Sequence, residues 1–130
     1  MYLIDTNIWL ERILDQKRTL EVGQFLDRVA SEKLYITDFA LHSIGIVLSK
    51  LKRLDIFLRF IQDAFMNGAV SLVHLEPEDM RQVADVESEF KLDFDDAYQY
   101  VSAEKNELTI VSFDSDFDRT KLGRKTPAEL

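Results

Sequence analysis

Two kinds of hydrophobic pattern alternate along the chain: short apolar runs, and longer segments in which apolar residues recur at helical spacing. The short runs have the length of buried strands and cover residues 1–4, 34–37, 70–75 and 108–111. Strands of a parallel sheet are buried on both faces, so they read as nearly continuous apolar runs. Such strands separated by helical segments predict an α/β fold, in which a central parallel sheet of four to five short strands is covered by helices on both faces.

The segments between the runs carry helical signals. Val22, Phe25 and Val29 recur at helical spacing, Asp38 is placed to cap a helix, and Pro77 suits a first helical turn. We expect helices over residues 8–14, 19–31, 38–51, 54–65, 77–90 and 93–106.

Length and composition bound the class of protein. With 130 residues, 46% of them hydrophobic, the chain has the size and apolar content of one domain, which we expect to span residues 1–130. It has no cysteine, which excludes disulfides and thiolate chemistry. The first apolar run stops at Asp5, too early for a signal peptide or a membrane span. We therefore expect a cytoplasmic protein that does not associate with a membrane.

The charge balance disfavours a general nucleic-acid coat. The net charge is −8, whereas phosphate binding depends on cationic contacts. Basic residues do cluster at 50–53 and 119–125, but for each cluster alone a solvated segment is the favoured interpretation.

Aspartates stand where such a sheet would bring them together. Asp5 ends the first apolar run, Asp114 follows the last one, and Asp96 lies near the start of the last helix. Ligands of open α/β sheets bind outside the carboxyl ends of the strands. Gathered carboxylates repel one another unless a cation compensates them, and an all-oxygen set suits Mg²⁺ or Mn²⁺. This combination predicts a metal-dependent phosphodiesterase, in which the ion activates water.

Each acidic motif also has a simpler interpretation. Asp93 and Asp96 can cap their helix and suit its dipole, which is the favoured interpretation for that helix alone. Residues 114–118 have the opening spacing of a calcium loop, but Arg119 and Lys125 stand where that loop needs glycine and glutamate. The Asp-x-Asp pattern there also resembles the haloacid dehalogenase phosphatases, but too little chain follows it for such a domain. None of these interpretations accounts for the three motifs together.

Taken in order, three stretches resemble the acidic motifs of PIN domains, the fold of VapC-type toxins: Leu3–Asn7, Asp93–Ala97 and Ile110–Phe117. Each motif is weak alone, but the ordered set is fairly specific and covers essentially the whole chain. The resemblance implies a Mg²⁺- or Mn²⁺-dependent endoribonuclease that acts on RNA, is often a homodimer, and is often held inactive by an antitoxin protein.

The resemblance also implies roles for single residues. It makes Asp5, Asp96 and Asp114 metal-binding acids and Asp116 an accessory acid, with Asn7 and Ser112 as polar supports and Asp93 as an additional candidate.

The chain departs from the family pattern at one point. The family usually has a glutamate on the helix after the second strand, and the stretch from Thr37 is expected to put His42 in its place. Imidazole is a poor ligand for Mg²⁺ but an acceptable one for Mn²⁺. One alternative is therefore a weakened or non-catalytic PIN-like binding module. The other is that His42 is a surface histidine without a role.

Overall fold

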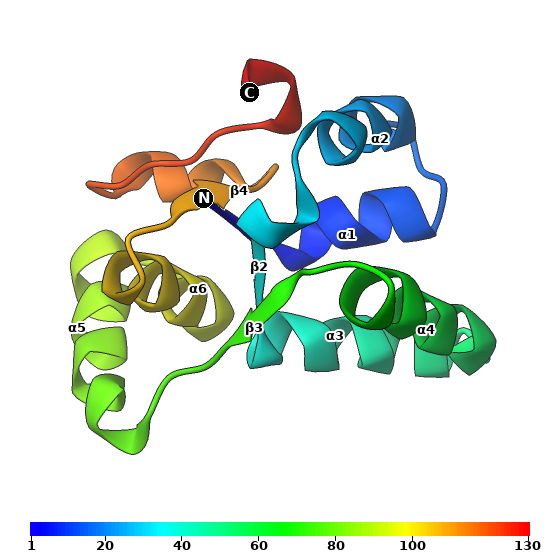
Figure 1. Cartoon of the computed structure of the whole chain (residues 1–130). Coiled ribbons are helices and arrows are strands. Elements are labelled where there is room, and N and C mark those ends of the chain that lie inside the picture. The colour runs from blue at the N-terminus through cyan, green and yellow to red at the C-terminus, as the bar shows by residue number, and fades with distance from the viewer.

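The computed structural model describes residues 1–130 and places four parallel strands in one sheet, in the order β3-β2-β1-β4 (Figure 1). The strands are β1 (Tyr2–Ile4), β2 (Leu34–Thr37), β3 (Ser71–Val73) and β4 (Thr109–Val111). They lie within the four predicted apolar runs, and the expected α/β fold with a parallel sheet is confirmed.

Six α-helices connect and cover the strands: α1 (Thr6–Ile13), α2 (Thr19–Arg28), α3 (Asp38–Lys50), α4 (Leu54–Ile61), α5 (Met80–Phe90) and α6 (Phe94–Lys105). In Figure 1, α5 and α6 lie on one side of the sheet, and α1, α2, α3 and α4 lie on the other. None of these helices combines the length and the apolar character that crossing a bilayer requires.

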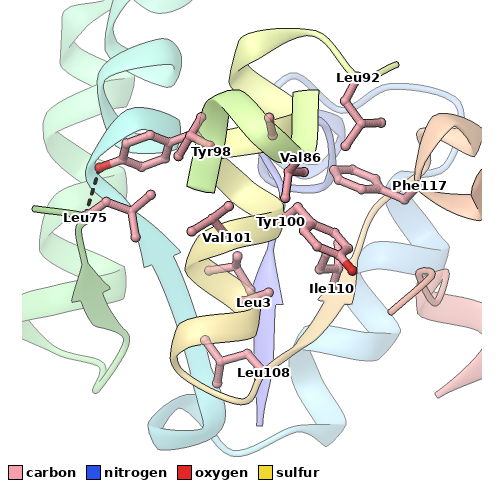
Figure 2. Packing of buried hydrophobic residues seen from close by; sticks show 13 residues of the cluster. Leu3, Leu75, Val86, Leu92, Tyr98, Tyr100, Val101, Leu108, Ile110 and Phe117 are labelled. Carbon is pink, nitrogen blue, oxygen red and sulfur yellow. Dashed lines mark hydrogen bonds between the residues drawn. The ribbon is translucent and has the colours of Figure 1, made fainter. Parts of the chain in front are cut away.

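The sheet separates two cores, because successive residues of a strand point to opposite faces. Leu3 and Ile110 pack under α5 and α6, as Figure 2 shows, whereas Ile4 and Val111 pack on the other face, against α1 to α4. Leu3, Ile4 and Val111 are fully buried. The two cores hold β1 and β4 in register, which fixes the position of whatever follows each strand.

Two local expectations are corrected by the structure. Thr37 rather than Asp38 caps α3, because the Thr37 hydroxyl accepts a hydrogen bond from the Ala40 amide at 2.9 Å. The Asp38 carboxylate instead accepts a hydrogen bond from the Tyr98 hydroxyl at 2.8 Å. The helix over 54–65 ends its α-helical part at Ile61 and continues as one π-helical turn, Gln62–Met66.

The residue that follows β1 lies beside the residue that follows β4, since these two parallel strands are neighbours in the sheet, β1 inside it and β4 at its edge. The Asp5 amide donates a hydrogen bond to the Val111 carbonyl at 3.0 Å. Beyond this point both segments leave the sheet: α1 follows β1, and a loop follows β4.

Candidate metal centre

Asp5 is the innermost acid at this edge of the sheet. It is 6% exposed and caps α1, its Oδ1 accepting from the Thr6 amide at 2.8 Å. The same oxygen accepts from the Gln99 side-chain amide at 3.1 Å, and Oδ2 accepts from the Ser112 hydroxyl at 2.7 Å. Burial raises the pKa of Asp5, and the hydrogen bonds from Ser112, Gln99 and Thr6 partly oppose this effect.

Asn7 and Ser112 join the start of α1 to the loop after β4. The Ser112 hydroxyl accepts hydrogen bonds from the Asn7 side-chain amide at 3.2 Å and from the Asp114 amide at 2.9 Å. The Asn7 side-chain oxygen accepts from the Phe113 amide at 3.2 Å. These bonds hold Asp114 next to Asp5, although more than a hundred residues separate the two in the sequence.

The second and third acidic motifs meet at the same place. Carboxylate oxygens of Asp96, Asp114 and Asp116 lie within 4.8 Å of one another, and so do those of Asp93, Asp95 and Asp96. A cavity of about 280 Å³ is lined by members of both groups and by Asp5, whereas Asp116 lies outside its lining. Its acidic lining residues are Asp5, Asp93, Asp95, Asp96 and Asp114.

This crowding of acids perturbs Asp96 most. Burial raises the pKa of Asp96 to about 8, together with its hydrogen bond to Asp114 and the negative charges of Asp5, Asp114 and Asp95. Without a cation, Asp96 is therefore mostly protonated at neutral pH. A cation in the cavity would compensate the repulsion that the proton now relieves.

The donor set fits a hard divalent cation. The atoms that converge are carboxylate oxygens, supported by the Asn7 amide and the Ser112 hydroxyl, and no sulfur or imidazole lines the cavity. Mg²⁺ and Mn²⁺ prefer such oxygen ligands and commonly keep several waters. The cavity leaves room for those waters beside the acids.

The predicted N-cap position of Asp93 at the start of α6 is confirmed, but its side chain makes no bond that would cap the helix. Its carboxylate lines the cavity instead, and Asp95 bonds the Asp96 amide at 3.0 Å.

Gln99 is a residue of the site that the sequence patterns did not reveal. It is buried, donates to Asp5, and accepts a hydrogen bond from the Thr37 hydroxyl at 2.5 Å. The available signal was a polar residue three positions after Asp96 in a helix whose residues 96–103 are otherwise mostly small or apolar. Gln99 links the cap of α3 to the buried carboxylate.

His42 does not line the acidic cavity, so the prediction that it occupies the glutamate position is wrong. It is exposed and lines a separate groove with Gly45, Ser49 and Phe57. Ser43, the next residue, lines the acidic cavity. One residue rotates a helix by about 100°, which is enough to move a side chain from the cavity to the neighbouring face.

Two of the four basic residues of segment 119–125 form ion pairs with acids. Arg119 pairs with Asp116 at 3.0 Å, and Arg124 pairs with Asp118 at 3.1 Å. Arg119 also donates to the carbonyls of Phe90 at 3.0 Å and Lys91 at 2.6 Å, which ties the loop after β4 to the turn between α5 and α6.

Comparison with known proteins gives one family and a consistent fold. The model of a family described as "PIN domain" matches residues 2–122. No curated protein sequence matches the chain. Among solved structures, the chain resembles a toxin-antitoxin complex from Klebsiella pneumoniae, with a TM-score of 0.78, 19% identity, and coverage of 98% of each chain.

Two further structures are similar over nearly their whole length. FitAcB from Neisseria gonorrhoeae has a TM-score of 0.77 and 19% identity, with 100% of each chain covered. VapC20 from Mycobacterium tuberculosis, described as a toxin that cleaves the sarcin-ricin loop, has a TM-score of 0.75 and 15% identity, with 91% of this chain and 93% of that chain covered. At these identities the resemblance concerns the fold.

Proposed function

The chain belongs to the PIN domain family, and from its acidic cavity we propose that it is a Mg²⁺- or Mn²⁺-dependent endoribonuclease, the toxin of a toxin–antitoxin pair. The observation that carries the proposal is the convergence of carboxylates from three distant motifs in one cavity, where the pKa of Asp96 is raised to about 8. Such a perturbed group beside like charges is typical of a functional site.

In this proposal, Asp5, Asp96 and Asp114 hold the cation, and Asp116 is the accessory acid. A bound ion would polarise a phosphoryl oxygen of the substrate and lower the pKa of a bound water for phosphodiester hydrolysis. Binding of the cation would displace the proton of Asp96 to solvent. Ser112 and Gln99 keep the Asp5 carboxylate oriented, since each donates a hydrogen bond to one of its oxygens. Asp93, at the cavity rim, is a further candidate for holding a metal-bound water.

RNA as the substrate is supported by the structural likeness to VapC20, whose description names cleavage of the sarcin-ricin loop. An antitoxin partner is supported by the likeness to a toxin-antitoxin complex. We also propose a homodimer, because α3 and α4 expose large apolar side chains to solvent. These are Ile46, Leu51, Leu54 and Leu58.

A second candidate function is a PIN-like module that binds without cutting, or cuts weakly. It is favoured by Ser43, the only polar residue of α3 that lines the cavity, because its side chain is neutral and adds no further carboxylate. In this case the acids hold a metal without efficient turnover.

The test is cleavage of RNA by the purified full chain with Mg²⁺, with Mn²⁺ and with chelator. Asp114→Asn serves as the inactive control, and Asp27→Asn, an exposed change on α2, serves as the matched control. Cleavage that needs the cation and Asp114 supports the nuclease. Cation binding without cleavage by the parent protein supports the binding module, and the absence of both contradicts the metal centre.

A further inference from the structure

An aromatic pair borders the acidic cavity on the side of α3 and α6. Phe39 lines the cavity, and its ring centroid lies 6.4 Å from that of Phe94. Phe94 is 49% exposed, although it lies between Asp93 and Asp95, which both line the cavity. A large aromatic face is therefore open to solvent at the rim of the acidic cavity.

The support beneath this pair is rigid. Phe39 packs on Tyr98 with the ring centroids 5.3 Å apart. The Tyr98 hydroxyl accepts a hydrogen bond from the Leu75 amide at 3.0 Å, as Figure 2 shows, and donates one to Asp38. Phe94 therefore packs against an aromatic stack that these hydrogen bonds hold in place.

A free guanidinium lies next to the third acidic motif. The guanidinium of Arg18 lies 4.4 Å from the ring centroid of Phe113, the residue before Asp114. Unlike Arg119 and Arg124, Arg18 forms no ion pair with a carboxylate, and it is exposed. The Phe113 amide donates a hydrogen bond to the Asn7 side chain, which holds the backbone of the residue on which Arg18 stacks.

These two features supply what the cavity itself lacks. A polyanion is repelled by a chain of net charge −8 and by five aspartates around the cavity, so it needs a cationic contact and an uncharged one close by. An arginine provides the cationic contact, by binding a phosphate. An open aromatic ring offers the second to any unpaired base, because every base has a π-face.

We infer that Phe94, supported by Phe39, stacks an unpaired base of the substrate strand, and that Arg18 on Phe113 contacts a phosphate of the same strand. The inference rests on the proposed ribonuclease function and deepens it, since the substrate segment is then single-stranded. A base paired within a helix cannot lay its face on Phe94.

The test measures binding without cleavage, in the full chain carrying Asp114→Asn. The probes are a fluorescein-labelled single-stranded RNA of mixed sequence and the duplex that it forms with its complement, followed by anisotropy in Mg²⁺. We expect the single strand to bind more tightly than the duplex. Phe94→Ala should weaken single-strand binding by roughly tenfold, the usual effect of removing one stacked ring, and Phe94→Tyr should restore it.

Arg18→Gln should weaken binding of every sequence and reduce the dependence of log affinity on log salt by about 0.7, the value for one phosphate contact to a single strand. Leu72→Ala on β3 and Arg81→Gln on α5 are matched controls, since both residues are exposed and neither lines the acidic cavity. Both controls should bind like the parent.

A strand with one abasic position, moved along the probe, identifies the stacked base. At that position the penalty of Phe94→Ala should disappear. Equal binding by parent and Phe94→Ala at every position, or equal affinity for single strand and duplex, overturns the inference. Failure of the nuclease is distinguishable, because a parent chain that never cleaves RNA can still show, or fail to show, the Phe94-dependent binding.

Discussion

At the scale of single residues, Asp96 couples the metal-free fold to pH. Its pKa of about 8 in the folded protein lies above the ordinary value of 3.8, so the folded state binds the proton more tightly than the unfolded state does. The stabilisation from this proton is complete below about pH 4 and is lost as pH rises towards 8.

We therefore expect the melting temperature in chelator to fall between pH 5 and pH 8.5, and Asp96→Asn to remove most of that fall. At pH 8.5 the variant should be more stable than the parent, because one repelling charge is gone, whereas near pH 5 the two should be similar. Differential scanning calorimetry checks this, with Asp27→Asn as control. A variant that is less stable than the parent at pH 8.5 would show that Asp96 contributes structurally.

Ser43 offers a test of the missing carboxylate. Ser43→Glu points a further acid into the cavity, so Mg²⁺ affinity should rise several-fold and any metal-dependent cleavage should increase, while the melting temperature in chelator should fall.

The neighbouring change His42→Glu is the matched control, since it adds the same charge one residue away in a different groove. Calorimetric titration of Mg²⁺ into both variants makes the comparison. Equal affinities would mean that only net charge matters and would remove Ser43 from the site.

At the scale of elements, Arg119 joins the two loops that carry the acids. It bonds the end of α5 through the Phe90 and Lys91 carbonyls and holds Asp116 beside Asp114. Arg119→Gln removes the charge that faces Asp116, so the melting temperature in chelator should fall by a few degrees, consistent with a loss of about 1 kcal/mol.

Saturating Mn²⁺ should recover much of this loss, because the cation then compensates Asp116. Arg124→Gln is the control, since Arg124 pairs with Asp118, which does not belong to the acidic groups of the cavity. Its effect on the melting temperature should be the same with and without Mn²⁺. A loss in Arg119→Gln that Mn²⁺ leaves unchanged would assign Arg119 to the fold alone.

The elements show how far the sequence predicts the structure. The strands and the helical segments follow from hydrophobic periodicity, so Asp5 and Asp114 could be placed at one sheet edge in advance. It is harder to predict which residues of a helix point towards the site. An error of one residue turns a side chain by about 100°, as His42 and Ser43 demonstrate. The roles of Gln99 and Thr37 were not predicted, because the hydrogen bond between them depends on how α6 crosses β2, and no local sequence pattern indicates that crossing.

At the scale of the whole molecule, the exposed apolar side chains of α3 and α4 predict self-association. Leu54 and Ile46 border a groove of about 550 Å³ that also contains Phe57. Leu54→Glu should therefore shift a dimer towards the monomer in light scattering coupled to size-exclusion chromatography.

Leu122→Glu is the matched control, because Leu122 is similarly exposed but lies after β4, away from α3 and α4. It should leave the mass unchanged. A parent chain that is monomeric at every concentration tested would contradict the homodimer.

The bond from Ser112 to Asp5 spans 107 residues, which has a consequence for a chain made on the ribosome. β1 leaves the ribosome long before its neighbour β4 and the acids that follow β4. An unfinished or prematurely terminated chain therefore carries Asp5 without Asp114 and has no assembled cavity. The proposed nuclease would therefore become active only after the ribosome has translated the last acidic motif. An antitoxin could accumulate during that time.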